Sequence, residues 1–195
     1  ITRLEQAIRS RNSEFRNFPE LAHQQQVIYR VLSNDSDLSR KVFSRISPDI
    51  KSIYQLHLNA RKEFLSMGEG RPMPSVMPAW EIVTPESPNQ LLSHYKKAED
   101  STGIPWEVLA AINLVETGMG RISGVSVANA RGPMQFLLTT WNLDGIGNGG
   151  DIYDPHDSIQ AAARYLVSRG GLEDIRKGLW GYNNSDYYGR AVMEY

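Results

Sequence analysis

The 195 residues of the chain suffice for one generous domain, or for a compact domain that carries an extension. Cysteine is absent, which excludes cysteine-ligated zinc, a thiol nucleophile and a disulfide framework. Lysine and arginine number 21 against 22 acidic residues, and the net charge of −1 gives no overall basic field that would point to nucleic acid. No apolar run approaches the roughly 18 residues of a membrane span, and no signal-like segment stands at the first residues.

These averages conceal two differently built halves. Of the 16 glycines, 14 lie from Gly103 onward. Residues 1–80 carry a net charge of +4, whereas residues 81–195 carry −5. We therefore expect a helical first part and a loop-rich, acidic second part.

Residues 1–67 are predicted to form an N-terminal helical segment, because their apolar residues recur at helical spacing. The sequence predicts a helix around 21–32, a break with a new helix cap at 34–37, and a second helix around 38–46. Ser47-Pro48-Asp49 is typical of a helix start and predicts a third helix that ends near Leu65. The segment is open to three roles: a substrate-delivery arm, a docking element for a protein partner, or a brace for the second part.

Residues 68–88 are predicted to form an extended linker, since they contain five of the ten prolines in the chain. Proline removes a backbone donor and biases the residue before it toward extended geometry. Trp80, Ile82 and Val83 indicate that part of this stretch packs against a domain.

Helices resume at Ser87, which favours an all-α fold for the whole chain. One predicted helix ends at Thr102-Gly103, and the next begins at Pro105 and ends at Thr117-Gly118. A short helix is expected near 136–141 and a longer one from Pro155 to about Ser168. The remaining tail begins helical and ends rich in tyrosine.

Glu116 is the candidate catalytic residue. It shares a helix face with Leu109, Ile112 and Asn113 and lies in the last helical turn. Desolvation and the negative end of the helix dipole would both raise its pKa. A carboxyl that stays protonated near neutral pH can serve as a general acid; the alternative is a helix-terminal glutamate that points to water.

Glycosidases usually pair such an acid with a second carboxylate about 5 to 10 Å away. No acidic residue lies between Glu116 and Asp144. The four aspartates at 144, 151, 154 and 157 are explained equally by calcium or by a helix start. Ile146 and Pro155 occupy calcium-loop positions that need oxygen ligands. His23, His57 and His94 follow no ligand spacing, so we predict no zinc site; we name no metal ligand among the site residues, and calcium in the aspartate loop stays open.

Four motifs in order suggest a family. They are VETGMG (115–120), NARGPMQF (129–136), DIYDPHDSIQAAARYL (151–166) and GLWGYNN (178–184). This series resembles the soluble lytic transglycosylase-like (SLT) domain of glycoside hydrolase family 23, over about residues 89–195. VETGMGR and DIYDPHDSIQ also resemble the B-type lytic transglycosylases of family 103, which carry a calcium loop in this region.

The resemblance implies a lysozyme-like catalytic domain that cleaves the β-1,4 bond between N-acetylmuramic acid and N-acetylglucosamine in peptidoglycan. Glu116 matches the single acid/base of the family, whose substrate supplies its own 2-acetamido oxygen and 6-hydroxyl to close a 1,6-anhydro ring. No second carboxylate and no cofactor are required. The resemblance also implies that the protein acts outside the cytoplasm, on glycan strands as its partner.

Other site residues follow from the same resemblance. Thr117 stands where the family usually has serine and would place a hydroxyl beside the sugar. Gln135 would hydrogen-bond an N-acetyl or hydroxyl group, Tyr182 would orient Glu116, and Asn183 would help bind saccharide. Leu137 and Leu138 replace a usual Met-Pro pair, and so alter one wall of the expected cleft.

Two other functions remain open from the sequence. One is a lysozyme-type hydrolase, whose product contains an added water. The other is a peptidoglycan-binding module with a silent site; Glu116, Gln135 and Tyr182 argue against it, whereas the departures at Thr117 and Leu137 leave it open.

Overall fold

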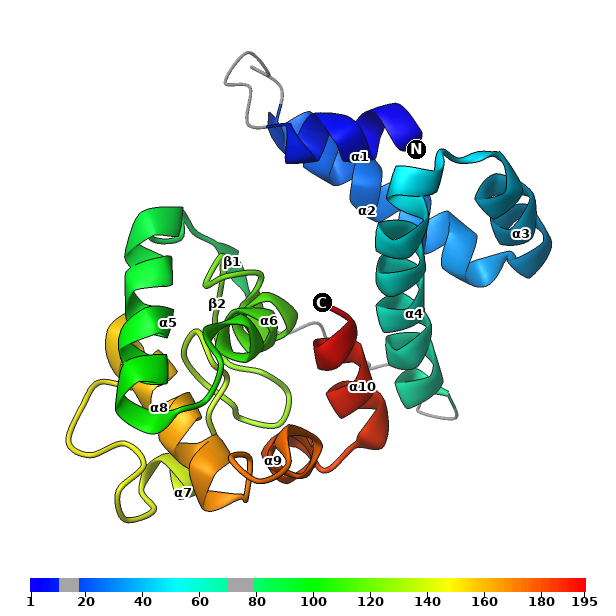
Figure 1. Ribbon diagram of the computed structural model, residues 1–195. Coiled ribbons are helices and arrows are strands. Elements are labelled where there is room, and N and C mark those ends of the chain that lie inside the picture. The colour runs from blue at the N-terminus through cyan, green and yellow to red at the C-terminus, as the bar shows by residue number, and fades with distance from the viewer. Residues whose placement is uncertain (11–17, 70–78) are drawn as a thin grey trace. The chain divides into compact units, whose positions relative to one another are not determined.

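The computed structural model describes residues 1–10, 18–69 and 79–195 (Figure 1). The chain divides into two compact units, one of residues 1–69 with 194–195 and the other of residues 70–193. The described residues form ten α-helices and a single pair of two-residue strands, so the all-α prediction is confirmed. Within the described residues, no helix is both long and apolar enough to cross a membrane.

The first unit consists of four helices around a small core. They are α1 (Thr2–Arg9), α2 (Phe18–Asn34), α3 (Ser36–Arg45) and α4 (Lys51–Gly68), the last preceded by the 3₁₀ turn η1 (Pro48–Ile50). Asp35 caps α3, because its side chain accepts a hydrogen bond of 2.8 Å from the Leu38 amide, as the break at 34–37 predicted. The core comprises Tyr29, Leu32, Ile46, Tyr54 and Leu58.

The sequence analysis did not predict α1. This helix buries Leu4 and also a charged residue, Glu5, so its apolar pattern is short and interrupted. Of the predicted linker at 68–88, residues 70–78 lie outside the described residues. Gly68 ends α4, and the residues from 79 onward belong to the second unit.

The second unit packs helices around α8 (Pro155–Ser168), whose alanines at 161–163 are fully buried. Against it lie α5 (Pro88–Thr102), α6 (Trp106–Thr117) and α9 (Ile175–Asn183); α7 (Leu138–Trp141) and α10 (Asp186–Glu194) complete the unit. Ser87 and Gln90 form a capping box at the start of α5. Asp154 caps α8 through a 2.9 Å bond from the Asp157 amide.

The two strands join the segment before α5 to the loop after α6. Strand β1 (Glu81–Ile82) pairs antiparallel with β2 (Ile122–Ser123). The Val83 amide extends the pairing with a 2.9 Å bond to the Arg121 carbonyl. Trp80 packs directly over Gly124, where a Cβ atom would lie 2.9 Å from the indole. This segment thus holds the loop that follows Glu116.

Candidate active site

Glu116 lies in the last turn of α6, as predicted, and is half-buried. Leu109, Ile112 and Asn113, which share its helix face, are all fully buried. Burial raises the pKa of Glu116 to about 7, and a hydrogen bond from Tyr188 only partly offsets that rise. No charged neighbour among the described residues contributes to the shift. The carboxyl is therefore a substantially protonated acid near neutral pH.

Tyr188, on α10, is the residue that contacts this carboxyl. Its hydroxyl donates a 2.7 Å hydrogen bond to Glu116 Oε1, and its side chain is 2% exposed. Burial, followed by the nearby Glu116 charge, raises the pKa of Tyr188 well above its usual value. Tyr188 therefore remains a neutral donor. The sequence analysis missed it, because the contact spans 72 residues along the chain.

Tyr182 lies beside Tyr188 but does not bond Glu116. The two rings stack nearly parallel, with centroids 6.3 Å apart and planes 6° apart. The Tyr182 hydroxyl instead donates a 2.8 Å bond to the Met134 carbonyl. The expected contact between Tyr182 and Glu116 is thus corrected: Tyr182 fastens the 131–136 turn, and Tyr188 contacts the acid.

Thr117 is 1% exposed, and its hydroxyl is used inside the protein. It donates a 2.7 Å bond to the Pro133 carbonyl and accepts a 2.9 Å bond from the Gly120 amide. In this geometry the hydroxyl joins two loop segments and is not available to a saccharide. Gly118, which ends α6 with φ +62°, supplies the left-handed residue that turns the chain into this loop.

Gln135 lies on a tight turn closed by the bridge between Arg131 and Phe136. Its backbone has φ +50°, and its side-chain amide donates a 3.0 Å bond to the Gly132 carbonyl. Gly132 has no substitute here, because a Cβ would lie 1.9 Å from the Ile152 carbonyl oxygen. Asn183 is half-buried and is the last residue of α9.

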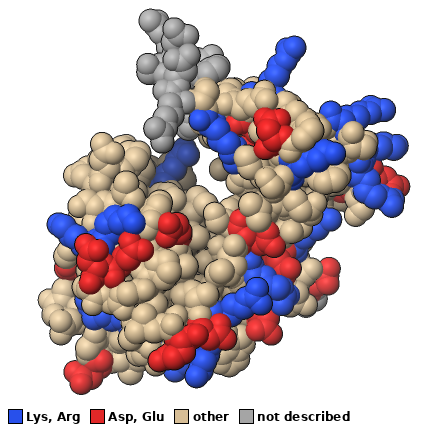
Figure 2. Space-filling view, viewed as in Figure 1, with Lys and Arg blue, Asp and Glu red and all other residues tan. Residues whose placement is uncertain are grey.

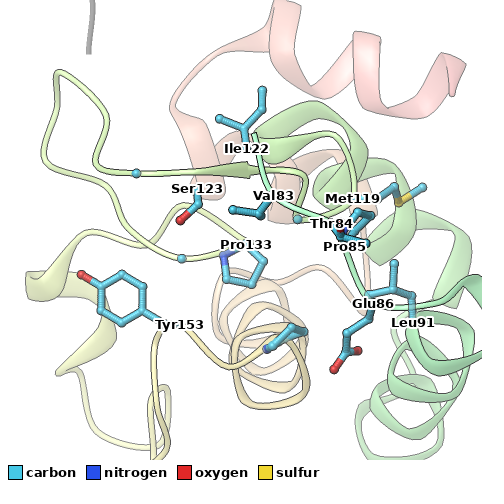
Figure 3. A pocket seen from close by; sticks show the side chains of 14 residues that line it. Val83, Thr84, Pro85, Glu86, Leu91, Met119, Ile122, Ser123, Pro133 and Tyr153 are labelled. Carbon is cyan, nitrogen blue, oxygen red and sulfur yellow. The ribbon is translucent and has the colours of Figure 1, made fainter. Parts of the chain in front are cut away.

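A pocket of about 280 Å³ adjoins the loop that follows α6 (Figure 3). Its lining includes Gly120 and Pro133, the two residues that the Thr117 hydroxyl joins. Figure 3 shows Tyr153 at one end of the pocket and Glu86 at the other. Glu116, Gln135, Tyr182 and Asn183 do not line it, so this pocket and the predicted site are separate features.

The aspartate-rich loop serves the start of α8. Asp154 caps that helix, and Asp157 Oδ2 accepts a 2.9 Å bond from the Asp151 amide. Asp154, His156 and Asp157 could together offer three ligand atoms to a metal ion. Since two of these side chains already bind backbone amides, the helix start accounts for the cluster, and we assign no metal to it.

Residues 93–187 match the family model described as Transglycosylase SLT domain. The match contains all four sequence motifs, and it ends one residue before Tyr188. No curated protein and no solved structure matches the chain.

Proposed function

Because the chain contains a soluble lytic transglycosylase-like domain, we propose that it cleaves peptidoglycan with Glu116 as its single general acid/base. The SLT domain itself indicates lytic transglycosylase-type activity on peptidoglycan. Our proposal is more specific. The bond cleaved is the β-1,4 linkage between N-acetylmuramic acid and N-acetylglucosamine, and the product ends in a 1,6-anhydromuramoyl residue.

The observation that carries the proposal is the environment of Glu116. Its pKa is raised to about 7 by burial, and its partner is the neutral hydroxyl of Tyr188. An acid with such a pKa can give up a proton and take it back near neutral pH, which one residue must do if it acts as both acid and base. A paired-carboxylate mechanism would need a second acidic group beside it, and no acidic neighbour contributes to its pKa among the described residues.

The steps balance without water. The Glu116 carboxyl donates its proton to the glycosidic oxygen as the C1–O bond breaks, and the N-acetylglucosamine end leaves as an alcohol. The substrate's 2-acetamido oxygen supports the positive charge at C1. The Glu116 carboxylate then takes the proton of the muramoyl 6-hydroxyl as O6 bonds to C1, which closes the anhydro ring and restores the acid.

The other predicted residues have distinct parts in this proposal. Gln135, on its fixed turn, would hydrogen-bond an N-acetyl or hydroxyl group of the sugar, and Asn183 would bind saccharide from the end of α9. Tyr182 would act on substrate through the turn that it fastens and through its stacked partner Tyr188. Thr117 would hold the loop after the acid, since its hydroxyl is buried.

Digestion of purified cell-wall sacculi tests the role of Glu116. We expect wild type to release anhydro-muropeptides and E116Q to lose about a thousandfold or more of the rate, because the amide cannot supply a proton. E107Q is the matched control, since Glu107 is exposed at the other end of α6 and should leave the rate unchanged. Release that persists at the wild-type rate in E116Q would exclude Glu116 as the acid.

Mass spectrometry of the products separates the remaining alternatives. A lysozyme-type hydrolase gives reducing ends that are heavier by one water than the anhydro products. Saccharide binding by wild type without any turnover would instead identify a silent binding module. Either result would overturn the transglycosylase proposal.

We also place the protein outside the cytoplasm, in the compartment where its proposed substrate lies. SLT domains typically act there. Fractionation of the producing cells, with the chain detected by antibody, checks this location.

A further inference from the structure

The first unit contains a groove that the proposed chemistry does not use. It lies between α2 and α3, with the start of α1 at its edge, and has a volume of about 690 Å³. Its apolar lining consists of isoleucine, valine and leucine side chains. A cavity of this size and composition is typical of a binding site for an apolar ligand.

The helices leave apolar side chains exposed along this groove. Val27 and Val31, one turn apart on α2, are 40% and 51% exposed, and Leu38 on α3 is 38% exposed. Leu32 and Ile46 form the buried floor and belong to the core of the unit. The exposed part of this face therefore lacks a covering element within the described residues of the unit.

Three cations border the apolar lining. Arg3 comes from α1, and Lys41 and Arg45 lie one turn apart on α3. No carboxylate lines the groove, and within the described residues no ion pair joins these cations to an acidic side chain. Figure 2 shows blue side chains gathered over α3, at the right of the view. The groove thus combines an apolar interior with an uncompensated positive edge.

The lining favours lipid over protein as the occupant. Protein interfaces are enriched in aromatic residues and methionine at their centres and are poor in lysine. This groove has no aromatic residue or methionine, and Thr2 is its one uncharged polar residue. Aliphatic side chains beside lysine and arginine are the combination that binds the acyl chains and anionic headgroups of a membrane.

We propose that this α2–α3 groove binds an anionic phospholipid at a membrane surface. The aliphatic side chains contact acyl carbon atoms, while Arg3, Lys41 and Arg45 contact the headgroup phosphate. The proposal rests on the first unit alone and does not depend on Glu116. It assigns the N-terminal helices a docking role, with lipid rather than protein as the partner.

Vesicle binding by the full chain tests the proposal. The probes are sedimented vesicles of equal parts phosphatidylglycerol and phosphatidylcholine, compared with vesicles of phosphatidylcholine alone. We expect a clear preference for the anionic vesicles, reduced by salt because headgroup contacts are screened. R45E should weaken binding about fivefold or more, since one surface cation contributes about that factor. V31D should weaken it about tenfold or more, because it places a charge on the apolar lining.

Matched controls separate the groove from general charge and apolarity. R30E makes the same charge change at an exposed position of α2 outside the groove, and L56D makes a comparable apolar-to-acidic change on α4. Both should bind vesicles within about twofold of wild type. E116Q should bind as wild type does, so a failure of the proposed catalysis leaves this test intact.

Three outcomes would overturn the proposal. One is equal or absent binding to both vesicle types, and a second is an equal loss in the controls and the groove variants. The third is a dimer in size-exclusion chromatography that V31D dissociates while vesicles stay unbound, which would make the groove an interface between copies. A circular dichroism spectrum of each variant that matches the wild-type spectrum establishes that a loss of binding is not a loss of fold.

Discussion

Each unit contains a glutamate whose carboxyl is desolvated by burial, and the pKa values of these two carboxyls shift in opposite directions. Glu5 in the first unit is 0% exposed and is bound by the Gln25 amide at 3.0 Å and by the Arg9 guanidinium. Burial favours a higher pKa for Glu5, but these partners outweigh burial and hold the pKa below its usual value. Glu116 in the second unit has one neutral partner, and burial raises its pKa to about 7.

The difference teaches that burial alone does not fix the state of a carboxyl; its partners do. Glu5 has a cation and an amide, so it stays ionised and ties α1 to α2. Glu116 lacks a cation among the influences on its pKa, so it keeps a proton that chemistry can use. Glu5 serves stability, and in the proposed function Glu116 gives up stability for reactivity.

The largest expected effect follows from removing Glu5. E5A leaves Gln25 and Arg9 without their shared acceptor, and we expect it to lower the free energy of unfolding of the first unit by about 3 kcal/mol. Amide hydrogen exchange in α1 and α2 measures this unit by itself. E20A, at an exposed position of α2, is the control and should change the free energy by about 0.5 kcal/mol or less. Exchange as slow as that of wild type would contradict the structural role of Glu5.

The pH dependence of stability sharpens the comparison. The folded pKa of Glu116 lies above its ordinary value of 4.5, so its contribution to stability is present below about pH 4.5 and is lost as the pH rises to about 7. The E116Q side chain does not ionise, so this variant does not lose stability in that way. The free energy of unfolding of E116Q minus that of wild type should therefore rise by about 3 kcal/mol between about pH 4 and about pH 8.

Urea denaturation of both proteins at the two pH values measures this change. Glu5 has the opposite sign, because its depressed pKa gives stability above the unfolded value that is lost as the pH falls through the folded one. A pH-independent difference between E116Q and wild type would show that Glu116 is not held in a desolvated site.

A smaller effect is expected from the loop that follows the acid. T117V leaves the Gly120 amide without its acceptor and removes one donor from the Pro133 carbonyl, at a cost of about 2 kcal/mol in the free energy of unfolding. T117S retains the hydroxyl and should cost less than half as much. Thermal unfolding of the two variants beside wild type makes the comparison. Wild-type stability of T117V together with a loss in T117S would mean that the methyl group, rather than the hydroxyl, holds the loop.

The smallest expected effect is a shift in the pH profile. The Tyr188 hydrogen bond lowers the pKa of Glu116, so Y188F should raise that pKa and move the alkaline limb of kcat/KM to higher pH. The shift should be smaller than the one that burial produces, since burial is the larger influence. Y187F changes the exposed neighbour and should leave the limb in place. A limb that moves to lower pH would contradict the assigned hydrogen bond.

Local signals made much of the fold predictable. Asp35, Ser87 and Asp154 cap the helices that their positions indicated, and Gly103 and Gly118 end the two helices before the loop. Each of these signals acts within a few residues through one backbone bond or one backbone angle. The strands β1 and β2 could not be found in this way, because two-residue strands carry no periodicity and pair across about forty residues of sequence.

The candidate site also contains features that local sequence predicts and features that depend on contacts between distant segments. Glu116 could be chosen as the candidate acid because its helix face is mostly apolar, a pattern contained in α6. The hydrogen bonds of Thr117 and Tyr182 could not be predicted from the sequence. Their hydroxyls bond the Pro133 and Met134 carbonyls across turns whose geometry the sequence does not give. The sequence could not single out Tyr188 among the tyrosines of the tail, because only packing decides which of them contacts Glu116.

The sequence by itself predicted most helices of the second half, the four motifs that lie within the match to the SLT family model, and Glu116 as the candidate acid. It did so because caps, glycine turns and apolar periodicity act over short stretches of chain. Only the tertiary structure decided which tyrosine contacts Glu116, why Glu5 stays ionised and where an apolar groove remains open beside Lys41 and Arg45. Those outcomes depend on which side chains from distant segments meet in the absence of water, and that follows from packing.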